Sequence, residues 1–371
     1  MKVTLISINS INENTGGGIY LRCLQKLYTS NGIELNVICK SDNGSGFKKG
    51  IFTDILSRVF FLSPSFLAYY FIKVIWKCKN SDVIAIHSSR LGFYAWFIKF
   101  IYPKKKLYVH TDNVEAKLIL DNCAAGGIFK KILSRIDSLL IPYSERLCAK
   151  WSDKITFITQ QDLSEYTKLY SLQEDKTAIV PIYLPSPTKK NENYNDKRDA
   201  IIFTGSFDFY PNQDALYSLI EVSKKLQGLK FVVAGRKLNE FISKENITIP
   251  DNVVTESDVT SERLQELYSQ SCIFLCPVRF GSGMKTKIAE ALSYGLYVIA
   301  NEKSVAGYSS AIAAGVVSSK NNIGFHDEVV IELADFFQKN NNEIHSYSVC
   351  VFNENYNLNT GIKRFSEILL K

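Results

Sequence analysis

The stretch that most limits what this chain can fold into runs from Cys272 to Gly295 and reads CIFLCPVRFGSGMKTKIAEALSYG. Its first part, Ile273 to Val278, is a short apolar run bounded by turn residues, which is typical of a strand buried on both faces. Apolar residues at helical spacing follow a glycine-containing turn, and Gly295 is placed to end that helix in a left-handed conformation. The stretch therefore predicts a strand, a loop and a helix of a doubly wound α/β unit.

The loop between the predicted strand and helix is suited to bind an anion. Gly281 and Gly283 leave the backbone uncovered, and Ser282 is an appropriate N-cap for a helix that we expect to begin near Met284. Unpaired amides and the positive end of a helix dipole attract negative charge at such a place. The spacing differs from the Walker loop, which needs a glycine before its lysine, and from the dinucleotide fingerprint, whose ribose acid lies about 20 residues further on.

Three charged residues follow this loop. Lys285 and Lys287 add positive charge, and Glu290 lies one turn beyond Lys287 on the same helix face. The two acceptor oxygens of a glutamate can hold a pair of neighbouring hydroxyls. The pattern predicts a site for a phosphorylated sugar. The alternative is a tight structural loop, in which Lys287 and Glu290 form a surface ion pair worth only a few tenths of a kcal/mol.

The sequence PVRFGSGMKTKIAEALSYGLYVIA resembles the nucleotide-sugar motif of the retaining glycosyltransferases of family 4, whose members have the two-domain GT-B fold. In that family the helix glutamate binds the nucleotide ribose and basic residues bind the diphosphate. The resemblance implies these roles for Glu290 and Lys287, and Lys285 stands where arginine is common. Ser282 stands where many members have a second acid, eight residues before the glutamate.

A second amide-rich turn, Gly205 and Ser206, follows another predicted strand in the same half. The places where many family members have an arginine and a lysine in this turn hold neither here. The resemblance therefore implies that the other basic residues of the site neutralise the charge of the diphosphate, without a metal ion. The complete donor set that we expect is Gly205, Ser206, Arg279, Gly281, Ser282, Gly283, Met284, Lys285, Lys287 and Glu290.

The first half of the chain contains a similar strand, glycine loop and helix. Gly16, Gly17 and Gly18 follow a predicted first strand, which favours phosphate binding or close backbone approach. In the resembled family this loop lies across the cleft from the nucleotide, near the donor phosphate and the acceptor. The alternative is a flexible loop without a ligand.

Two polar residues, His110 and Asp112, come just after a predicted strand in the first half. Open α/β sheets bind ligands at this edge, and a histidine with an acid can orient an acceptor hydroxyl or the transferred sugar. The resemblance implies that both are active-site residues, whereas the alternative for His110 is a structural histidine. The resemblance also implies acceptor contact for Glu145, which is otherwise an exposed helix acid without a role.

At 371 residues, with 46% hydrophobic and 22% charged residues, the chain is long enough for about two globular domains. The net charge of +7 is unevenly placed: residues 1–185 hold 24 Lys and Arg against 15 Asp and Glu, and residues 186–371 hold 20 against 22. A basic first half indicates an anionic partner surface. Because no nucleic-acid module is recognisable, membrane phosphates are favoured over nucleic acid.

Two further patterns bear on location. The eight cysteines show neither a CxxC pair nor metal-ligand spacing, so we expect reduced thiols in a cytoplasmic protein. The start MKVTLISIN lacks the pattern of a signal peptide. Residues 47–78 are aromatic and basic, but their apolar part contains Pro64 and is too short to span a membrane. They predict either helices lying on the inner face of the plasma membrane or core helices with solvated lysines.

The resemblance and the patterns together predict two doubly wound Rossmann-like domains facing across a cleft. Residues 1–185 form the acceptor side, with a C-terminal helix at about 356–371 crossing back, and residues 186–355 bind the nucleotide sugar. The implied activity is retaining transfer of a sugar from a UDP- or GDP-sugar to a saccharide or lipid-linked acceptor, in bacterial surface polysaccharide synthesis. The alternatives are a nucleotide-sugar epimerase of the same fold and a binding or scaffold protein that has lost catalysis.

Overall fold

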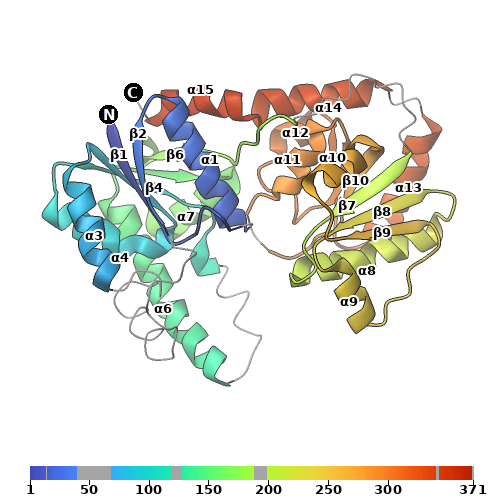
Figure 1. The fold of residues 1–371 in the computed structure, drawn as a ribbon, viewed down its shortest axis with the longest axis horizontal. Helices are drawn as coiled ribbons and strands as arrows, with labels where there is room; N and C mark the ends of the chain where they lie inside the picture. Colours follow the sequence, from blue (N-terminus) through green and yellow to red (C-terminus); the bar gives the residue numbers. More distant parts are fainter. Residues whose placement is uncertain are drawn as a thin grey trace. The chain divides into compact units, whose positions relative to one another are not determined.

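The computed structural model describes residues 1–13, 15–39, 68–117, 128–187, 199–281, 283–339 and 342–369 (Figure 1). The chain forms two compact units, one of Met1–Ile182 together with Gly361–Lys371, and one of Tyr183–Thr360. Each unit contains a parallel six-stranded sheet with helices. The predicted α/β fold with two doubly wound domains is therefore confirmed.

The sheet of the first unit has the strand order β2-β1-β3-β4-β5-β6. Its register aligns Ser7, His87, His110 and Thr156 in one row across β1, β3, β4 and β5. Because the strands are parallel, this polar row lies at the carboxyl edge, where such sheets bind ligands. The strands are β1 (Lys2–Ser7), β2 (Glu34–Ile38), β3 (Val83–His87), β4 (Lys106–His110), β5 (Lys154–Phe157) and β6 (Thr177–Ile179).

The sheet of the second unit has the order β12-β11-β10-β7-β8-β9, and β10 is fully buried as its apolar sequence predicts. The strands are β7 (Ala200–Thr204), β8 (Lys230–Gly235), β9 (Val253–Ser257), β10 (Ser271–Cys276), β11 (Tyr297–Asn301) and β12 (Val317–Lys320).

Helices flank both sheets (Figure 1). Those of the first unit are α1 (Gly16–Ser30), α3 (Ala68–Lys79), α4 (Gly92–Ile101), α6 (Ile128–Trp151), α7 (Gln160–Tyr170) and α15 (Leu358–Leu369). Those of the second unit are α8 (Tyr210–Lys225), α9 (Leu238–Lys244), α10 (Ser261–Ser269), α11 (Thr286–Ser293), α12 (Ser309–Ala313), α13 (Phe325–Gln338) and α14 (Asn342–Asn355).

The last helix, α15, returns to the first unit and packs on α1. The ring of Phe365 meets the ring of Tyr28 edge to face at 4.9 Å, and Asn31 Nδ2 donates to the carbonyl of Ile362 at 3.2 Å. Phe365 is buried, so these contacts remove apolar surface of α15 from water. The end of the chain is thus part of the core of the first unit.

The helix after the central loop, α11, begins later than its sequence indicates. Its N-cap is Lys285, which makes no side-chain capping bond, so the prediction of a cap at Ser282 is wrong, and Ser282 itself lies outside the described residues. Its end is as predicted, because Gly295 has a φ of 78°. The N–H of Leu296 donates to the carbonyl of Ala291, the bond that defines a Schellman motif.

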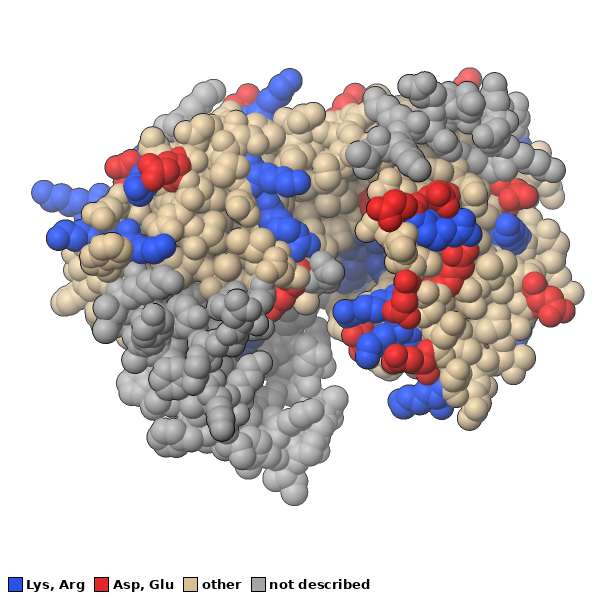
Figure 2. Space-filling view, viewed as in Figure 1, with Lys and Arg blue, Asp and Glu red and all other residues tan. Residues whose placement is uncertain are grey.

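Most of the aromatic and basic segment at 47–78 lies outside the described residues, and its described part is α3. No helix in the described ranges is long and apolar enough to cross a bilayer. On the face of the molecule shown in Figure 2, basic side chains predominate on the first unit, whereas both signs are mixed on the second. Contact with an anionic membrane stays a prediction.

The Schellman turn gives a stability test with a matched control. Gly295 and Gly315 both have positive φ, but only at Gly295 would an added Cβ meet another group, the carbonyl oxygen of His345 at 2.8 Å. We expect Gly315→Ala to cost about 1 kcal/mol from backbone strain alone. Gly295→Ala should lower the free energy of unfolding, measured by urea denaturation, by clearly more than Gly315→Ala does. Equal losses in the two variants would contradict the close approach of the His345 carbonyl to Gly295.

Candidate functional site

The side chain of Lys287 lies at the carboxyl edge of the second sheet. Its Nζ donates to the carbonyl of Thr204 and to Asn212 Oδ1, both at 2.8 Å, and lies 4.7 Å from the centroid of the Phe203 ring. Burial lowers the pKa of Lys287 to about 8. Within the described ranges no carboxylate forms an ion pair with this ammonium, so its charge is available to an anionic ligand.

The carboxylate of Glu290 lies one turn along α11. Tyr268 donates its hydroxyl to Glu290 Oε2 at 3.3 Å, and the same hydroxyl is 2.9 Å from Thr204 Oγ1. Burial raises the pKa of Glu290, while the hydrogen bond from Tyr268 and the charge of Lys287 lower it. Because Glu290 forms no ion pair with Lys287, the alternative of a structural surface pair is wrong.

The glycine loop before α11 uses a backbone conformation that glycine permits. Gly281 and Gly283 have φ values of 85° and 75°, which side-chain-bearing residues rarely adopt. Lys285 Nζ donates to the carbonyl of Gly281 at 3.0 Å. Tyr308, which the sequence analysis did not single out, donates its hydroxyl to the carbonyl of Lys285 at 2.8 Å and accepts from the N–H of Ala289 at 3.1 Å. A buried tyrosine thus fixes the start of α11.

Two other residues of the predicted donor set are less available. Arg279 forms a two-bond ion pair with Asp214, with N–O distances of 2.6 and 2.8 Å, so its charge is already compensated. The side chain of Met284 is buried, which leaves only its backbone for a ligand. A cavity of about 280 Å³ lies beside Arg279 at the ends of β10, β11 and β12, but neither Lys287 nor Glu290 lines it.

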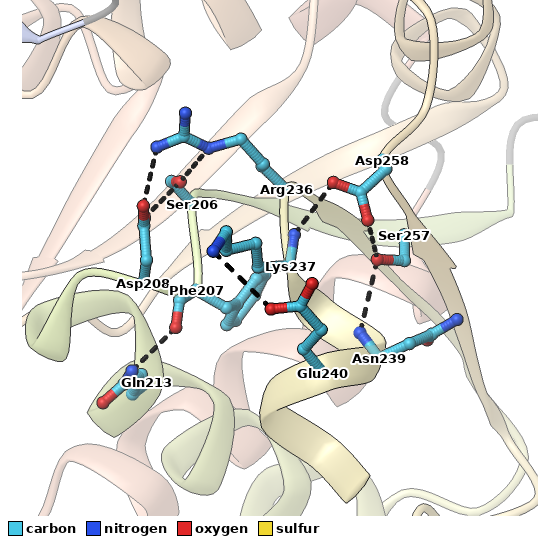
Figure 3. A network of polar contacts seen from close by, with 10 residues as sticks. All are labelled: Ser206, Phe207, Asp208, Gln213, Arg236, Lys237, Asn239, Glu240, Ser257 and Asp258. Carbon is cyan, nitrogen blue, oxygen red and sulfur yellow. Dashed lines mark hydrogen bonds and ion pairs between the residues drawn. The ribbon is translucent and has the colours of Figure 1, made fainter. Parts of the chain in front are cut away.

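The turn after β7 receives a basic group from the neighbouring strand. Arg236 follows β8, and its Nε donates to Ser206 Oγ at 3.0 Å while Nη2 donates to Asp208 Oδ2 at 2.8 Å (Figure 3). The strands approach closely here, because a Cβ on Gly235 would lie 1.7 Å from the carbonyl oxygen of Gly205. The sequence analysis did not single out Arg236, because its contact with Ser206 depends on the pairing of β7 with β8.

His110 is a core residue in the first unit. It is fully buried, its Nε2 lies 2.8 Å from the hydroxyl of Tyr28, and its Nδ1 lies 2.7 Å from Thr156 Oγ1. Burial lowers the pKa of His110 to about 3, so the ring is neutral. Both nitrogens are satisfied inside the protein, which fits the structural alternative for His110, and its predicted active-site role stays a prediction.

His87, at the same register position in β3, differs from His110. Its Nδ1 lies 2.9 Å from Ser7 Oγ, but its Nε2 has no hydrogen-bond partner and lies 3.8 Å from Asp112 Oδ2. Burial lowers the pKa of His87, and the charge of Asp112 opposes this shift. The acid predicted for the site, Asp112, is therefore beside a histidine, but that histidine is His87.

Glu145 is fully buried, so its interpretation as an exposed acid is wrong. Its Oε1 accepts from Ser89 Oγ at 3.1 Å and from the N–H of Glu115 at 2.9 Å, and its Oε2 accepts from the hydroxyl of Tyr170 at 2.7 Å. Burial raises the pKa of Glu145. The side chain thus holds the segment after β4 in place, and its predicted contact with an acceptor stays a prediction.

The three glycines after β1 lie inside the first turn of α1 rather than in a loop before it. Thr15 caps the helix by accepting from the N–H of Gly18 at 3.2 Å. A Cβ on Gly18 would lie 2.1 Å from the backbone carbonyl oxygen of Glu13, whereas a Cβ on Gly16 would meet nothing within 4 Å. Close packing therefore explains Gly18, and the predicted phosphate contact of Gly16, Gly17 and Gly18 stays a prediction.

Three comparisons relate the chain to known proteins. Residues 198–335 match the family described as "Glycosyl transferases group 1". An "Uncharacterized 44.6 kDa protein in cps region" of Klebsiella pneumoniae is 25% identical over 276 residues, which cover 68% of this chain and 68% of that protein.

Two solved structures share the fold. WaaG, "a glycosyltransferase involved in lipopolysaccharide biosynthesis", has a TM-score of 0.65 at 13% identity over 99% of both chains. Alr3699/HepE of Anabaena, solved with UDP, has a TM-score of 0.66 at 14% identity over 100% of both chains. The chain is thus a GT-B protein. The family match of its second unit makes it a glycosyltransferase.

Glu115 gives a pH-dependent test of the first unit. Burial and the charges of Asp112 and Glu145 raise the pKa of Glu115 to about 8, against the opposing charge of Arg90. The folded state therefore binds this proton more tightly than the unfolded state, and stability falls as the pH rises from about 5 to 8. We expect the stability of Glu115→Gln relative to the wild type to increase by roughly 3 kcal/mol between pH 5 and pH 8.

Urea denaturation at both pH values measures this difference. Glu174, an exposed residue of the same unit, provides the control variant Glu174→Gln. A stability difference between Glu115→Gln and wild type that does not change with pH would show that the carboxyl titrates normally.

Proposed function

We propose that the protein transfers a sugar, with retention, from a nucleoside diphosphate sugar bound by the second unit, as the resembled family 4 enzymes do. The observation that carries the proposal is the ammonium of Lys287, which is held by Thr204 and Asn212 and has no carboxylate partner in the described ranges. An anion is the ligand that compensates such a charge.

The diphosphate would lie at the carboxyl edge of β7 and β10, between the glycine loop and the turn at Ser206. Lys285 and Lys287 approach this edge from the start of α11, and Arg236 approaches it from β8. Arg236 is ion-paired with Asp208 but 60% exposed, so we propose that its guanidinium exchanges this carboxylate for a phosphate when the donor binds. It would then supply the positive charge that the β7 turn itself lacks. Glu290 would accept two hydrogen bonds from the ribose hydroxyls.

These groups would promote bond cleavage electrostatically. Negative charge grows on the departing diphosphate, and preorganised cations and amides stabilise it without further rearrangement. We propose that no metal ion is needed. Transfer activity should therefore persist in EDTA, and activity restored only by added Mg²⁺ or Mn²⁺ would contradict this.

The comparisons support a pathway for this activity. Alr3699/HepE was solved with UDP and also with UDP-glucose, which makes UDP-sugars the first donors to test. WaaG acts in lipopolysaccharide biosynthesis, and the Klebsiella relative is encoded in a cps region. We propose bacterial surface polysaccharide synthesis, with a saccharide or lipid-linked acceptor and a site of action at the cytoplasmic membrane face. Release of sugar-modified product only in the presence of acceptor would separate transfer from epimerisation.

Calorimetry with UDP and with uridine tests the donor site. Glu290→Gln should weaken the binding of both ligands at least tenfold, because both contain the ribose, and tenfold corresponds to about 1.4 kcal/mol. Lys287→Met and Arg236→Met should weaken UDP binding to a similar extent but leave uridine binding unchanged, because these side chains would contact only the diphosphate.

Glu343→Gln, a change at an exposed residue of the second unit, is the control and should bind both ligands normally. If Glu290→Gln kept the wild-type affinity for uridine, Glu290 would not be the ribose ligand. If Lys287→Met weakened both ligands equally, the proposed division between diphosphate and ribose would be wrong.

A further inference from the structure

Two exposed aromatic rings lie together at the carboxyl edge of the second sheet. Tyr210 begins α8, after the β7 turn, and Phe280 directly precedes Gly281 of the glycine loop after β10. Their ring centroids are 5.4 Å apart and their planes are tilted by 46°. Tyr210 is 61% exposed and Phe280 is 41% exposed. Single exposed rings are common on protein surfaces, but a pair that joins two loops at a ligand-binding edge indicates a contact surface.

An ion pair holds the two rings in this arrangement. Arg279 donates to both carboxylate oxygens of Asp214, at 2.6 and 2.8 Å, and Asp214 lies one turn along α8 from Tyr210. The guanidinium carbon of Arg279 lies 5.4 Å from the centroid of the Phe280 ring, a distance typical of a cation–π contact. The loop after β10 is therefore fastened to the start of α8 beside the rings, so little conformational freedom is lost when a ligand stacks on them.

Both rings adjoin groups that contact the lysines of the proposed diphosphate site. Asn212, two residues after Tyr210, accepts from Lys287 Nζ at 2.8 Å. The carbonyl of Gly281, which directly follows the other ring, accepts from Lys285 Nζ at 3.0 Å. The rings thus border the place where the phosphates would lie.

The contacts around Lys287 run in an order that matches a sugar nucleotide. Glu290, the proposed ribose ligand, is linked to Thr204 through the hydroxyl of Tyr268. Lys287 binds Thr204 and Asn212, and the two rings follow on the side of Asn212. A ribose at Glu290 and a diphosphate at Lys287 would therefore place the transferred sugar next, at the rings. The base would lie beyond the ribose, at the other end of this row.

The electrostatic character of the rings selects the kind of ligand. The face of an aromatic ring is negative, so it does not attract a phosphate, but it does attract weakly positive C–H groups. A pyranose ring presents several C–H groups on one face and hydroxyls around its rim. The C–H face can cover Tyr210 and Phe280 while the hydroxyls stay in water, and the contact removes apolar surface of both partners from water.

We propose that Tyr210 and Phe280 form a stacking surface for the pyranose ring of the donor sugar. The proposal rests on the proposed function, since it names how the same site holds the group that is transferred. Both are positioning residues, because they orient the sugar ring against its diphosphate and exchange no proton with it. Stacking depends on the pattern of C–H groups on the ring face, so the same surface also discriminates between donors that share one nucleotide.

Calorimetry with UDP, UDP-glucose and UDP-galactose tests the stacking surface. Tyr210→Leu and Phe280→Leu should each weaken the binding of at least one UDP-sugar at least fivefold and change UDP affinity less than twofold, because UDP has no pyranose ring. Tyr210→Phe and Phe280→Tyr keep an aromatic face and should bind like the wild type. Tyr217→Leu, at a tyrosine of α8 that is 45% exposed, is the control and should bind all three ligands normally.

The affinity for UDP separates this proposal from the donor assignment. If UDP binding depends on Lys287 but neither leucine variant weakens the binding of a UDP-sugar, the stacking surface is wrong and the proposed function stands. If the leucine variants lose affinity for UDP and for the UDP-sugars to the same extent, the rings contact the nucleotide rather than the sugar, and the stacking surface is again wrong. If the wild type binds neither UDP nor a UDP-sugar, both proposals fail.

Discussion

The carboxyl edge of a parallel sheet is the constraint on which the proposed donor site depends. All strands end at the same edge, so polar residues that follow different strands are brought together and partly removed from water. In the second unit this edge holds Lys287 against the carbonyl of Thr204, and in the first it holds His87 beside Asp112. Burial makes an uncompensated charge costly, which is why the lack of a carboxylate beside the Lys287 ammonium indicates an anionic ligand.

Much of the second unit could be predicted from the sequence, because its signals are local. The apolar run of β10, the glycines before α11 and Gly295 after it depend on backbone conformations that only a few residue types permit. The cap of α11 could not be predicted, since Tyr308 comes from a later segment and binds the carbonyl of Lys285. Arg236 was missed for a similar reason: its contact with Ser206 follows from the pairing of β7 with β8.

The first unit shows the same limit in its histidines. His87 and His110 each end an apolar strand, so the sequence offers the same signal for both. The packing of α1 distinguishes them, because Tyr28 reaches His110 and hydrogen-bonds to it, while Tyr20 meets His87 only through its ring. A helix that begins at Gly16 sets which tyrosine lies over which strand, and this start was also not predicted. Catalytic and structural histidines therefore cannot be separated by their position after a strand alone.

The charged residues at the two edges do not follow the net charge of the two halves. The first half of the chain is the more basic one, yet its strand edge gathers the acids Asp112, Glu115 and Glu145. The second half is nearly neutral, yet its edge presents Lys287 and Arg236. Net charge thus says little about either site, because local placement decides which ligand is attracted. Under the proposed function the diphosphate binds at the second edge because Lys287 lies there without a carboxylate partner in the described ranges, although the second half as a whole has no excess of positive charge.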